Sequence, residues 1–271
     1  IDFAGGTAVH INAGAAALAV CIILGRRLGW PKTPMRPHNL TMVMLGAGLL
    51  WFGWFGFNAG SAYAADNTAA IAATNTLLAT CAAGLAWLIV EKIRDKKATS
   101  LGAASGIVAG LVAITPACAN VTPMGAILLG LVAGAVCAWA VTLKYKLGFD
   151  DSFDVVGIHL VGGLVGTLAL GFLASDLVEE GGQNGLLYGG DLNLLIVQII
   201  AAVGVMVYSF ILAAIIALAL RATIGIRSDE EDEVDGIDVA EHAETAYELG
   251  DSGAGGAFAG VGHSARAKEV E

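Results

Sequence analysis

Seven long apolar segments limit what this chain can fold into more than any other feature of its sequence. They lie at roughly residues 3–25, 39–61, 67–91, 101–119, 123–143, 152–174 and 194–220. A helix needs about 20 consecutive apolar residues to cross the core of a bilayer, and these runs are continuous rather than alternating in polarity. Since 56% of the residues are hydrophobic, the sequence predicts an all-α, polytopic membrane helix bundle of about seven transmembrane helices.

The distribution of basic residues predicts how the bundle is oriented. Lys and Arg follow the first, third, fifth and seventh segments, whereas the connections at about 62–66, 120–122 and 175–193 contain neither. Short cytoplasmic loops of membrane proteins carry the excess of Lys and Arg. We therefore expect a cell-membrane protein with residue 1 outside and a cytoplasmic C-terminal tail. The lipid bilayer is its expected surrounding, and no feature suggests nucleic-acid binding.

The C-terminal tail differs in composition from the rest of the chain. Residues 228–271 contain 13 Asp and Glu but only Arg266 and Lys268 as basic residues. We therefore expect two parts, a transmembrane domain at 1–227 and an acidic cytoplasmic region at 228–271. At the other end, Ile1 stands at the edge of the first segment with no signal peptide before it. We expect that the beginning of the protein is missing.

Two histidines occupy matching positions 149 residues apart. Asp2 and Asp151 precede His10 and His159 by eight residues, and a glycine stands four residues after each histidine. Ionisable side chains at membrane depth are costly and usually face a pore or a bundle interior. Chance similarity in a chain rich in Gly, Ala and Val, or two separately packed core histidines, would also account for the pattern. The matching frames favour a paired role, since paired segments in the two halves of a transporter indicate its binding site.

An aromatic stripe ends the second segment. Trp54, Phe57 and Ser61 follow one another at helical spacing and share one helix face. Aromatic residues at a membrane interface commonly form an anchoring belt. The alternative is a site for a small cation, which the aromatic faces and one hydroxyl group could bind.

Five segments resemble a known family. They read Asp2-Phe-Ala-Gly-Gly-Thr-Ala-Val-His10-Ile-Asn12, Pro37-His-Asn39, Gly53-Trp-Phe-Gly-Phe-Asn-Ala-Gly-Ser61, Thr115-Pro-Ala-Cys118 and Asp154-Val-Val-Gly-Ile-His159. They are similar to ammonium transporters of the Amt/Mep/Rh family, most closely to its prokaryotic Amt branch. The resemblance implies eleven helices per subunit, with two inverted repeats of five helices, and a homotrimer. The seven segments would match helices five to eleven.

The resemblance also implies roles for individual residues. His10 and His159 would be the twin histidines of the pore, where they could relay a proton. Trp54 would line the pore, and Phe57 would belong to its outer aromatic gate. The second gate Phe, and a Trp and a Phe of the outer cage, come from earlier helices in the family and have no counterpart in this chain.

Further implied sites lie outside the pore. Ser61 would belong to the outer cation site, Asp2 would lie beneath that vestibule, and Asp151 would be its partner in the second repeat. In the tail, the positions that resemble the family's cytoplasmic region are Gly236, Asp238, His242 and Tyr247. Relatives use that region to touch a neighbouring subunit and a PII-type signal protein. We favour docking for residues 235–248 and a solvated, disordered tail beyond about 250.

The expected function is transport of ammonium or ammonia. The cation would be recruited at the outer aromatic site and deprotonated, and ammonia would cross an apolar pore. Electrogenic transport and a gas channel both stay open, as does an ammonium sensor that signals through its tail. A retinal protein is excluded because the last segment contains no Lys. No catalytic residues, metal site or cofactor is expected, because the sequence shows no nucleophile–base pair, metal-ligand cluster or phosphate loop, and an enzyme is not favoured.

Overall fold

The computed structural model describes residues 1–178 and 181–245. The chain divides into two compact units, Ile1–Ile226 and Arg227–Glu271. The described residues form helices and no strand, and their one isolated β-bridge joins Val121 and Ala174. The predicted all-α helix bundle is confirmed.

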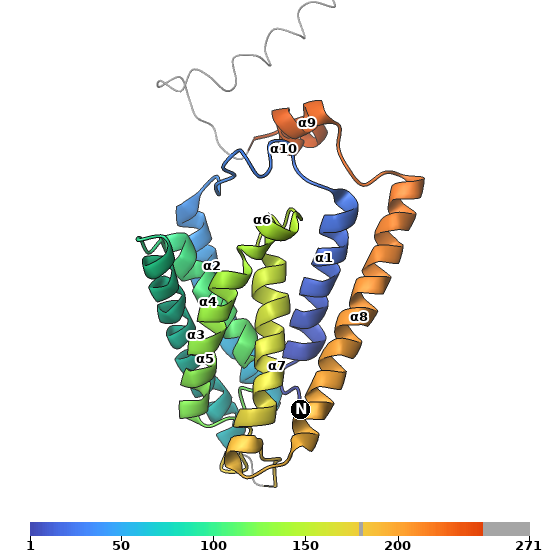
Figure 1. The fold of residues 1–271 in the computed structure, drawn as a ribbon. Helices are drawn as coiled ribbons and strands as arrows, with labels where there is room; N and C mark the ends of the chain where they lie inside the picture. Colours follow the sequence, from blue (N-terminus) through green and yellow to red (C-terminus); the bar gives the residue numbers. More distant parts are fainter. Residues whose placement is uncertain (179–180, 246–271) are drawn as a thin grey trace, which may run out of the picture. The chain divides into compact units, whose positions relative to one another are not determined.

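The first unit is a bundle of apolar helices (Figure 1). Its α-helices are α1 (Asn12–Leu24), α2 (Leu40–Asn58), α3 (Asn67–Arg94), α4 (Ser100–Ile114), α5 (Pro123–Ala140), α6 (Leu143–Leu147), α7 (Val161–Leu173) and α8 (Leu192–Thr223). Two π-helical segments, η1 (Gly6–Ile11) and η3 (Val156–Leu160), lead directly into α1 and α7. Single 3-10 turns, η2 (Gly60–Ala62) and η4 (Leu186–Tyr188), follow α2 and precede α8.

The fourth apolar segment forms a shorter helix than its composition suggests. Among the described residues, six helices are long and apolar enough to cross a membrane, whereas Ser100–Ile114 is shorter. Hydrophobicity continues to residue 119, but Pro116 has no N–H group and cannot continue the helix. The chain turns there instead, and the carbonyl groups of Thr115 and Pro116 accept hydrogen bonds from Ala4 and Phe3.

The helix starts follow from short polar side chains in the sequence. Each cap side chain accepts a hydrogen bond from a backbone N–H in the first turn of its helix, which satisfies a donor that has no partner within the helix. These caps are Asn39, Asp66, Thr99, Thr122 and Asp191, at the starts of α2, α3, α4, α5 and α8.

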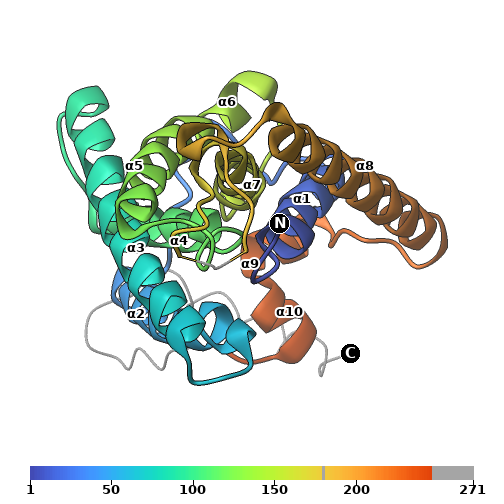
Figure 2. The same ribbon diagram turned by 90° about the horizontal axis from the view of Figure 1, so that it is seen from below.

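Small residues allow the helices to pack closely. Helix α3 packs against α4 and α5, while α8 lies beside α1 and α7 (Figure 2). A Cβ atom added at Gly106 would lie 2.7 Å from the Cβ of Trp87, and one at Gly110 would lie 2.7 Å from the Cβ of Ala83. Glycines spaced by four residues therefore let the backbones of α3 and α4 approach each other, as in other membrane bundles.

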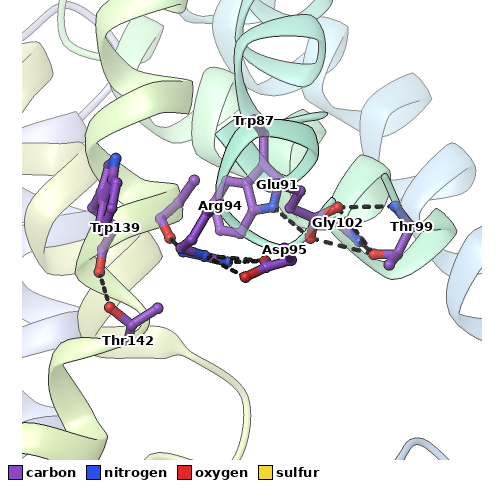
Figure 3. A network of polar contacts seen from close by, with 9 residues as sticks. Trp87, Glu91, Arg94, Asp95, Thr99, Gly102, Trp139 and Thr142 are labelled. Atoms are coloured by element: carbon purple, nitrogen blue, oxygen red, sulfur yellow. Dashed lines mark hydrogen bonds and ion pairs between the residues drawn. The ribbon is translucent and has the colours of Figure 1, made fainter. Parts of the chain in front are cut away.

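A buried carboxylate fixes the turn between α3 and α4 (Figure 3). Glu91 accepts hydrogen bonds from the indole N–H of Trp87, at 3.2 Å, and from the backbone N–H of Thr99, at 2.9 Å. The carboxylate packs directly against Gly102, where a side chain would collide with it. A negative charge at the start of α4 also complements the positive end of the helix dipole.

Arg94 extends the same network to α5. Its Nη1 donates to the carbonyl oxygen of Ala138 at 2.6 Å, and its Nη2 pairs with Asp95 at 2.7 Å. The guanidinium carbon lies 5.7 Å from the ring centre of Trp139, within the range of a cation–π contact (Figure 3). This end of the bundle is thus held by contacts among three helices.

The described part of the second unit, residues 227–245, contains two short helices, α9 (Glu230–Asp235) and α10 (Ile237–His242). Gly236 separates them with φ of 103°, a conformation that favours glycine. Asp238 lies in the first turn of α10, and His242 is its last residue. Tyr247 lies outside the described residues. The docking roles expected for Gly236, Asp238, His242 and Tyr247 stay predictions.

Candidate functional site

Two capped π-helical segments carry the histidines predicted to line the pore. His10 belongs to η1 and His159 to η3. The carboxylate of Asp2 accepts hydrogen bonds from the backbone N–H groups of Thr7 and Ala8, at 3.0 and 3.1 Å. A wide π-turn is rare and frequently occurs at functional sites.

Asp151 repeats this arrangement in the second half. Its carboxylate accepts from the N–H groups of Val155 and Val156, at 3.0 and 2.7 Å. Asp2 and Asp151, which occupy matching positions in the sequence, therefore have the same structural role. Each caps the start of the segment that carries the following histidine.

The two histidine segments cross where the repeated glycines lie. At Gly14, an added Cβ would overlap the backbone and Cβ of Leu160, the residue that follows His159. At Gly163, it would meet Cγ1 of Ile11, the residue that follows His10, at 3.0 Å. Each repeat thus presents its glycine to the other repeat's residue after the histidine. This reciprocal contact brings the histidines together.

The imidazole rings of His10 and His159 are in direct contact. Their Nδ1 atoms lie 3.3 Å apart, and the ring centres lie 5.3 Å apart. Such a contact needs one Nδ1 atom to carry a proton and the other to accept it. His10 is 3% exposed, and its Nε2 atom is buried without a hydrogen-bond partner among the described residues.

Aromatic rings cover the other face of His10. The ring of Trp54 stacks on it with centres 5.3 Å apart and planes inclined by 21°. Phe57 lies 6.1 Å from His10 and 5.4 Å from Trp54. The structure therefore brings four of the predicted site residues, His10, His159, Trp54 and Phe57, into one cluster.

The two residues predicted for the outer cation site lie near this cluster in sequence but make different contacts. Ser61 lies in η2, and its hydroxyl group donates to the carbonyl oxygen of Phe57 at 2.8 Å. Asp2 directs both carboxylate oxygens at the backbone of η1. Their assignment to an outer cation site stays a prediction.

Thr115 also belongs to the site, although its sequence position predicts no role for it. The indole Nε1 of Trp54 donates to the hydroxyl oxygen of Thr115 at 2.9 Å. That hydroxyl donates in turn to the carbonyl oxygen of Leu111 at 2.6 Å. The feature in the sequence that could have indicated it is a Thr directly before a Pro inside an apolar segment. A helix that ends there leaves backbone polar groups that need hydrogen-bond partners.

Two buried asparagines were also missed. Asn58 donates to the hydroxyl oxygen of Thr76 at 3.0 Å. Asn75 donates to the carbonyl oxygens of Cys118 and Val121, at 2.8 and 2.7 Å, and so holds the irregular segment after α4. Amide side chains in an otherwise apolar helix are the feature that would have indicated them.

Ion pairs hold the segment that leads into η3. Arg27 donates to the buried carboxylate of Asp150 from Nη2 at 2.7 Å, from Nε at 2.8 Å and from its backbone N–H at 2.9 Å. Burial alone raises the pKa of Asp150, but the hydrogen bonds from Arg27 outweigh it and hold that pKa below its ordinary value. Lys144 pairs with Asp154 at 2.6 Å. Burial raises the pKa of the Asp154 carboxyl group by more than the hydrogen bond and charge of Lys144 lower it, so this pKa lies above its ordinary value.

No cluster of three or more His, Cys, Asp and Glu side chains that could hold a metal ion occurs in residues 1–178 and 181–245. The polar groups of the site are instead two imidazoles, one indole and one hydroxyl group inside an apolar bundle. Such a site can donate and accept hydrogen bonds and can stack on a small cation, because a neutral imidazole carries one N–H donor and one acceptor nitrogen and aromatic faces attract positive charge.

Comparison with known proteins places the geometry in a family. The model of the Ammonium Transporter Family matches residues 1–247. An ammonium transporter of Mycobacterium tuberculosis (strain H37Rv) is 60% identical over 254 residues, which cover 92% of this chain and 53% of that protein. Ammonium transporter Amt1 of Archaeoglobus fulgidus is 45% identical over 249 residues, covering 91% and 62%.

Solved structures agree with this result. Candida albicans Mep2 has a TM-score of 0.79 and 36% identity, with 86% of this chain and 53% of that chain covered. A structure described as a sensor Amt protein has a TM-score of 0.80 and 33% identity, covering 89% and 60%. The chain spans about half the length of the curated relatives it matches.

Proposed function

This multi-pass membrane chain belongs to the ammonium transporter family, and we propose that it supplies the part of an ammonia-conducting pore that contains the twin histidines. The observation that carries the proposal is the contact between His10 and His159, with Nδ1 atoms 3.3 Å apart beneath a stacked Trp54 ring. Burying two imidazoles in an apolar bundle is energetically costly, and ionisable side chains inside membrane segments usually mark a functional site.

Selectivity for ammonium requires more than a pore of suitable size. Ammonium and potassium ions carry the same charge and are similar in size, so a pore for the bare cation would distinguish them poorly. Moving either ion into a low-dielectric interior costs several kcal/mol. Ammonium can lose a proton and cross as neutral ammonia, whereas potassium cannot avoid the cost.

The aromatic cluster would recruit the cation and the histidines would take its proton. Phe57 and Ser61 would form part of the outer site, with Trp54 between that site and His10. Ammonium would transfer one proton to Nε2 of His10, which is buried and faces no partner among the described residues. His10 would pass its Nδ1 proton to Nδ1 of His159, and Nε2 of His159 would release one.

Ammonia would follow the apolar pathway and recover a proton on the far side. Net movement would then be one ammonium ion per cycle, and transport would be electrogenic. If the histidines only donate hydrogen bonds to ammonia, no charge would move, and the pore would be a gas channel.

The test is an electrical measurement on the protein in proteoliposomes. We expect an ammonium pulse to evoke a current in the wild type, and an equal potassium pulse to evoke a far smaller one. His10→Asp should retain part of the ammonium current but admit potassium, because a carboxylate favours a bare cation in the pore. His38→Asp, in the loop before α2, is the matched control.

Each outcome separates the alternatives. Unchanged potassium exclusion in His10→Asp would contradict the proton relay. Uptake of labelled methylammonium without a current would indicate a gas channel. Neither uptake nor current in the wild type would contradict transport by this protein.

The assembly and orientation belong to the same proposal. We place residue 1 outside the cell and the tail in the cytoplasm, because the basic residues follow every second membrane segment. Family resemblance supports a homotrimer and a PII-type partner that docks on the tail at Gly236, Asp238, His242 and Tyr247.

An ammonium sensor is the second candidate, because a structure described as a sensor Amt protein is among the similar folds. Measuring binding of a PII-type protein to the tail alongside uptake would distinguish the two. A sensor would change its tail binding with ammonium and show little uptake.

A further inference from the structure

We propose that Thr115 is a positioning residue for ammonium selectivity, because its hydroxyl oxygen fixes the Trp54 ring on which His10 stacks. This inference rests on the proposed function, although one of its measurements does not require transport. Thr115 is completely buried, at the point where α4 ends before Pro116.

The hydroxyl group of Thr115 can serve Trp54 only as an acceptor. Its one hydrogen is donated to the carbonyl oxygen of Leu111 at 2.6 Å, the back-bond that Thr commonly makes in helices. Its lone pairs remain, and one accepts the indole Nε1–H of Trp54 at 2.9 Å. Since indole is a donor only, donor and acceptor are fixed in both groups.

This hydrogen bond determines how the indole ring lies. Trp54 is 7% exposed, so rotating the ring would leave its N–H buried without a partner, which is unfavourable. The same ring lies at 21° to the plane of His10. The orientation of Trp54 therefore limits the orientation of His10, whose Nδ1 atom must stay within reach of His159.

The backbone around Thr115 holds the histidine segment as well. The carbonyl oxygen of Thr115 accepts from the N–H of Ala4 at 3.3 Å, and that of Pro116 accepts from Phe3 at 3.0 Å. These two bonds tie the residues before η1 to the end of α4. Thr115 thus contacts Trp54 through its side chain and Ala4, which precedes the histidine segment η1, through its main chain.

Two substitutions separate the hydroxyl group from the shape of the side chain. Thr115→Val keeps the volume but removes the acceptor, whereas Thr115→Ser keeps the hydroxyl group. Thr74→Val is the matched control, because Thr74 makes the same back-bond, to Ala70 at 2.9 Å, on an exposed part of α3. A fourth variant, Trp54→Phe, lacks the indole N–H.

The first measurement is the ratio of ammonium to potassium current in proteoliposomes. We expect Thr115→Val to lower this ratio about tenfold, the equivalent of one lost hydrogen bond, and Thr115→Ser and Thr74→Val to stay within about twofold of the wild type. In the Trp54→Phe background, Thr115→Val should have no further effect. A ratio unchanged by Thr115→Val, or an equal loss in both backgrounds, would overturn the inference.

The second measurement follows the indole N–H itself by NMR. The Trp54 signal is identified by its loss in Trp54→Phe. We expect it to shift in Thr115→Val and to keep its position in Thr115→Ser and Thr74→Val. An unshifted signal in Thr115→Val would overturn the inference. If the wild type carries no ammonium current, the proposed function fails, and this measurement still decides whether Thr115 positions the ring.

Discussion

Gly14→Ala tests whether the reciprocal crossing of the two histidine segments holds the site together. The added Cβ would overlap the backbone N and Cα of Leu160, as well as its Cβ. Backbone atoms cannot rotate aside, so the segments must separate. Ordinary carbon contacts are about 3.5–4.0 Å, which requires a movement on the order of 1 Å.

The expected cost follows from two opposing terms. Inserting atoms into a packed interior costs about 1–3 kcal/mol, and an overlap with backbone belongs at the upper end. Replacing Gly by Ala within a helix recovers up to about 1 kcal/mol. We therefore expect Gly14→Ala to lower the free energy of unfolding by about 2 kcal/mol.

Two other glycines provide the comparison. At Gly163 the nearest atoms are Cγ1 of Ile11 at 3.0 Å and its backbone N at 3.2 Å, so shifts of a few tenths of an ångström relieve the contact. The two terms then nearly cancel, and the net change should be within about 1 kcal/mol. Gly204, on α8, has no atom of the described residues within 4 Å of its added Cβ and should tolerate Ala.

The assay is thermal unfolding of the purified protein, combined with the ammonium current. The order of stability should be Gly204→Ala, then Gly163→Ala, then Gly14→Ala. A movement near 1 Å would also break the 3.3 Å contact between the histidine Nδ1 atoms, so the current should fall with stability. If Gly14→Ala were as stable and as active as Gly204→Ala, the crossing would not position the histidines.

Three further predictions concern the buried carboxylates. Glu91→Ala should lower the free energy of unfolding by about 1–3 kcal/mol, because it leaves the N–H of Thr99 without its acceptor; thermal unfolding should show a smaller loss for Glu91→Gln. Arg27→Gln should cost stability at pH 7. Because the pKa of Asp150 is lower in the folded state, this difference should be complete above about pH 4 and disappear in unfolding experiments as the pH falls through the folded-state pKa. Asp151→Asn should reduce methylammonium uptake about tenfold, because an amide oxygen can replace only part of the carboxylate cap; unchanged uptake would show that the cap does not matter.

Much of the fold could be predicted from the sequence, because a bilayer demands long apolar helices. Their positions follow from hydrophobicity alone. The end of α4 does not, since the apolar residues continue past Pro116 while the helix stops at Ile114. The end of this helix is determined by a local property, the missing N–H of proline. A prediction from hydrophobicity alone therefore places the helix end too late.

The pairing of the histidines was predictable for a different reason. Repeats that contact each other must place equivalent residues in reciprocal positions, so a motif that occurs twice indicates where the two halves meet. The glycines four residues after His10 and His159 lie at that crossing. What the repeat could not indicate is the π-helical form of η1 and η3, because a π-turn is stabilised by its surroundings rather than by a sequence pattern.

The contact between Trp54 and Thr115 shows where sequence reasoning reaches its limit. The two residues are 61 positions apart, and neither belongs to the repeated motif. An indole N–H buried among helices must find an acceptor, so the sequence implies that a partner exists for Trp54. It does not say which helix supplies it, because that depends on how α2 and α4 pack. The repeated motif contains the histidines, which would carry the proton chemistry. Thr115, which orients the ring stacked on His10, lies outside the motif, and its contact depends on how the helices pack.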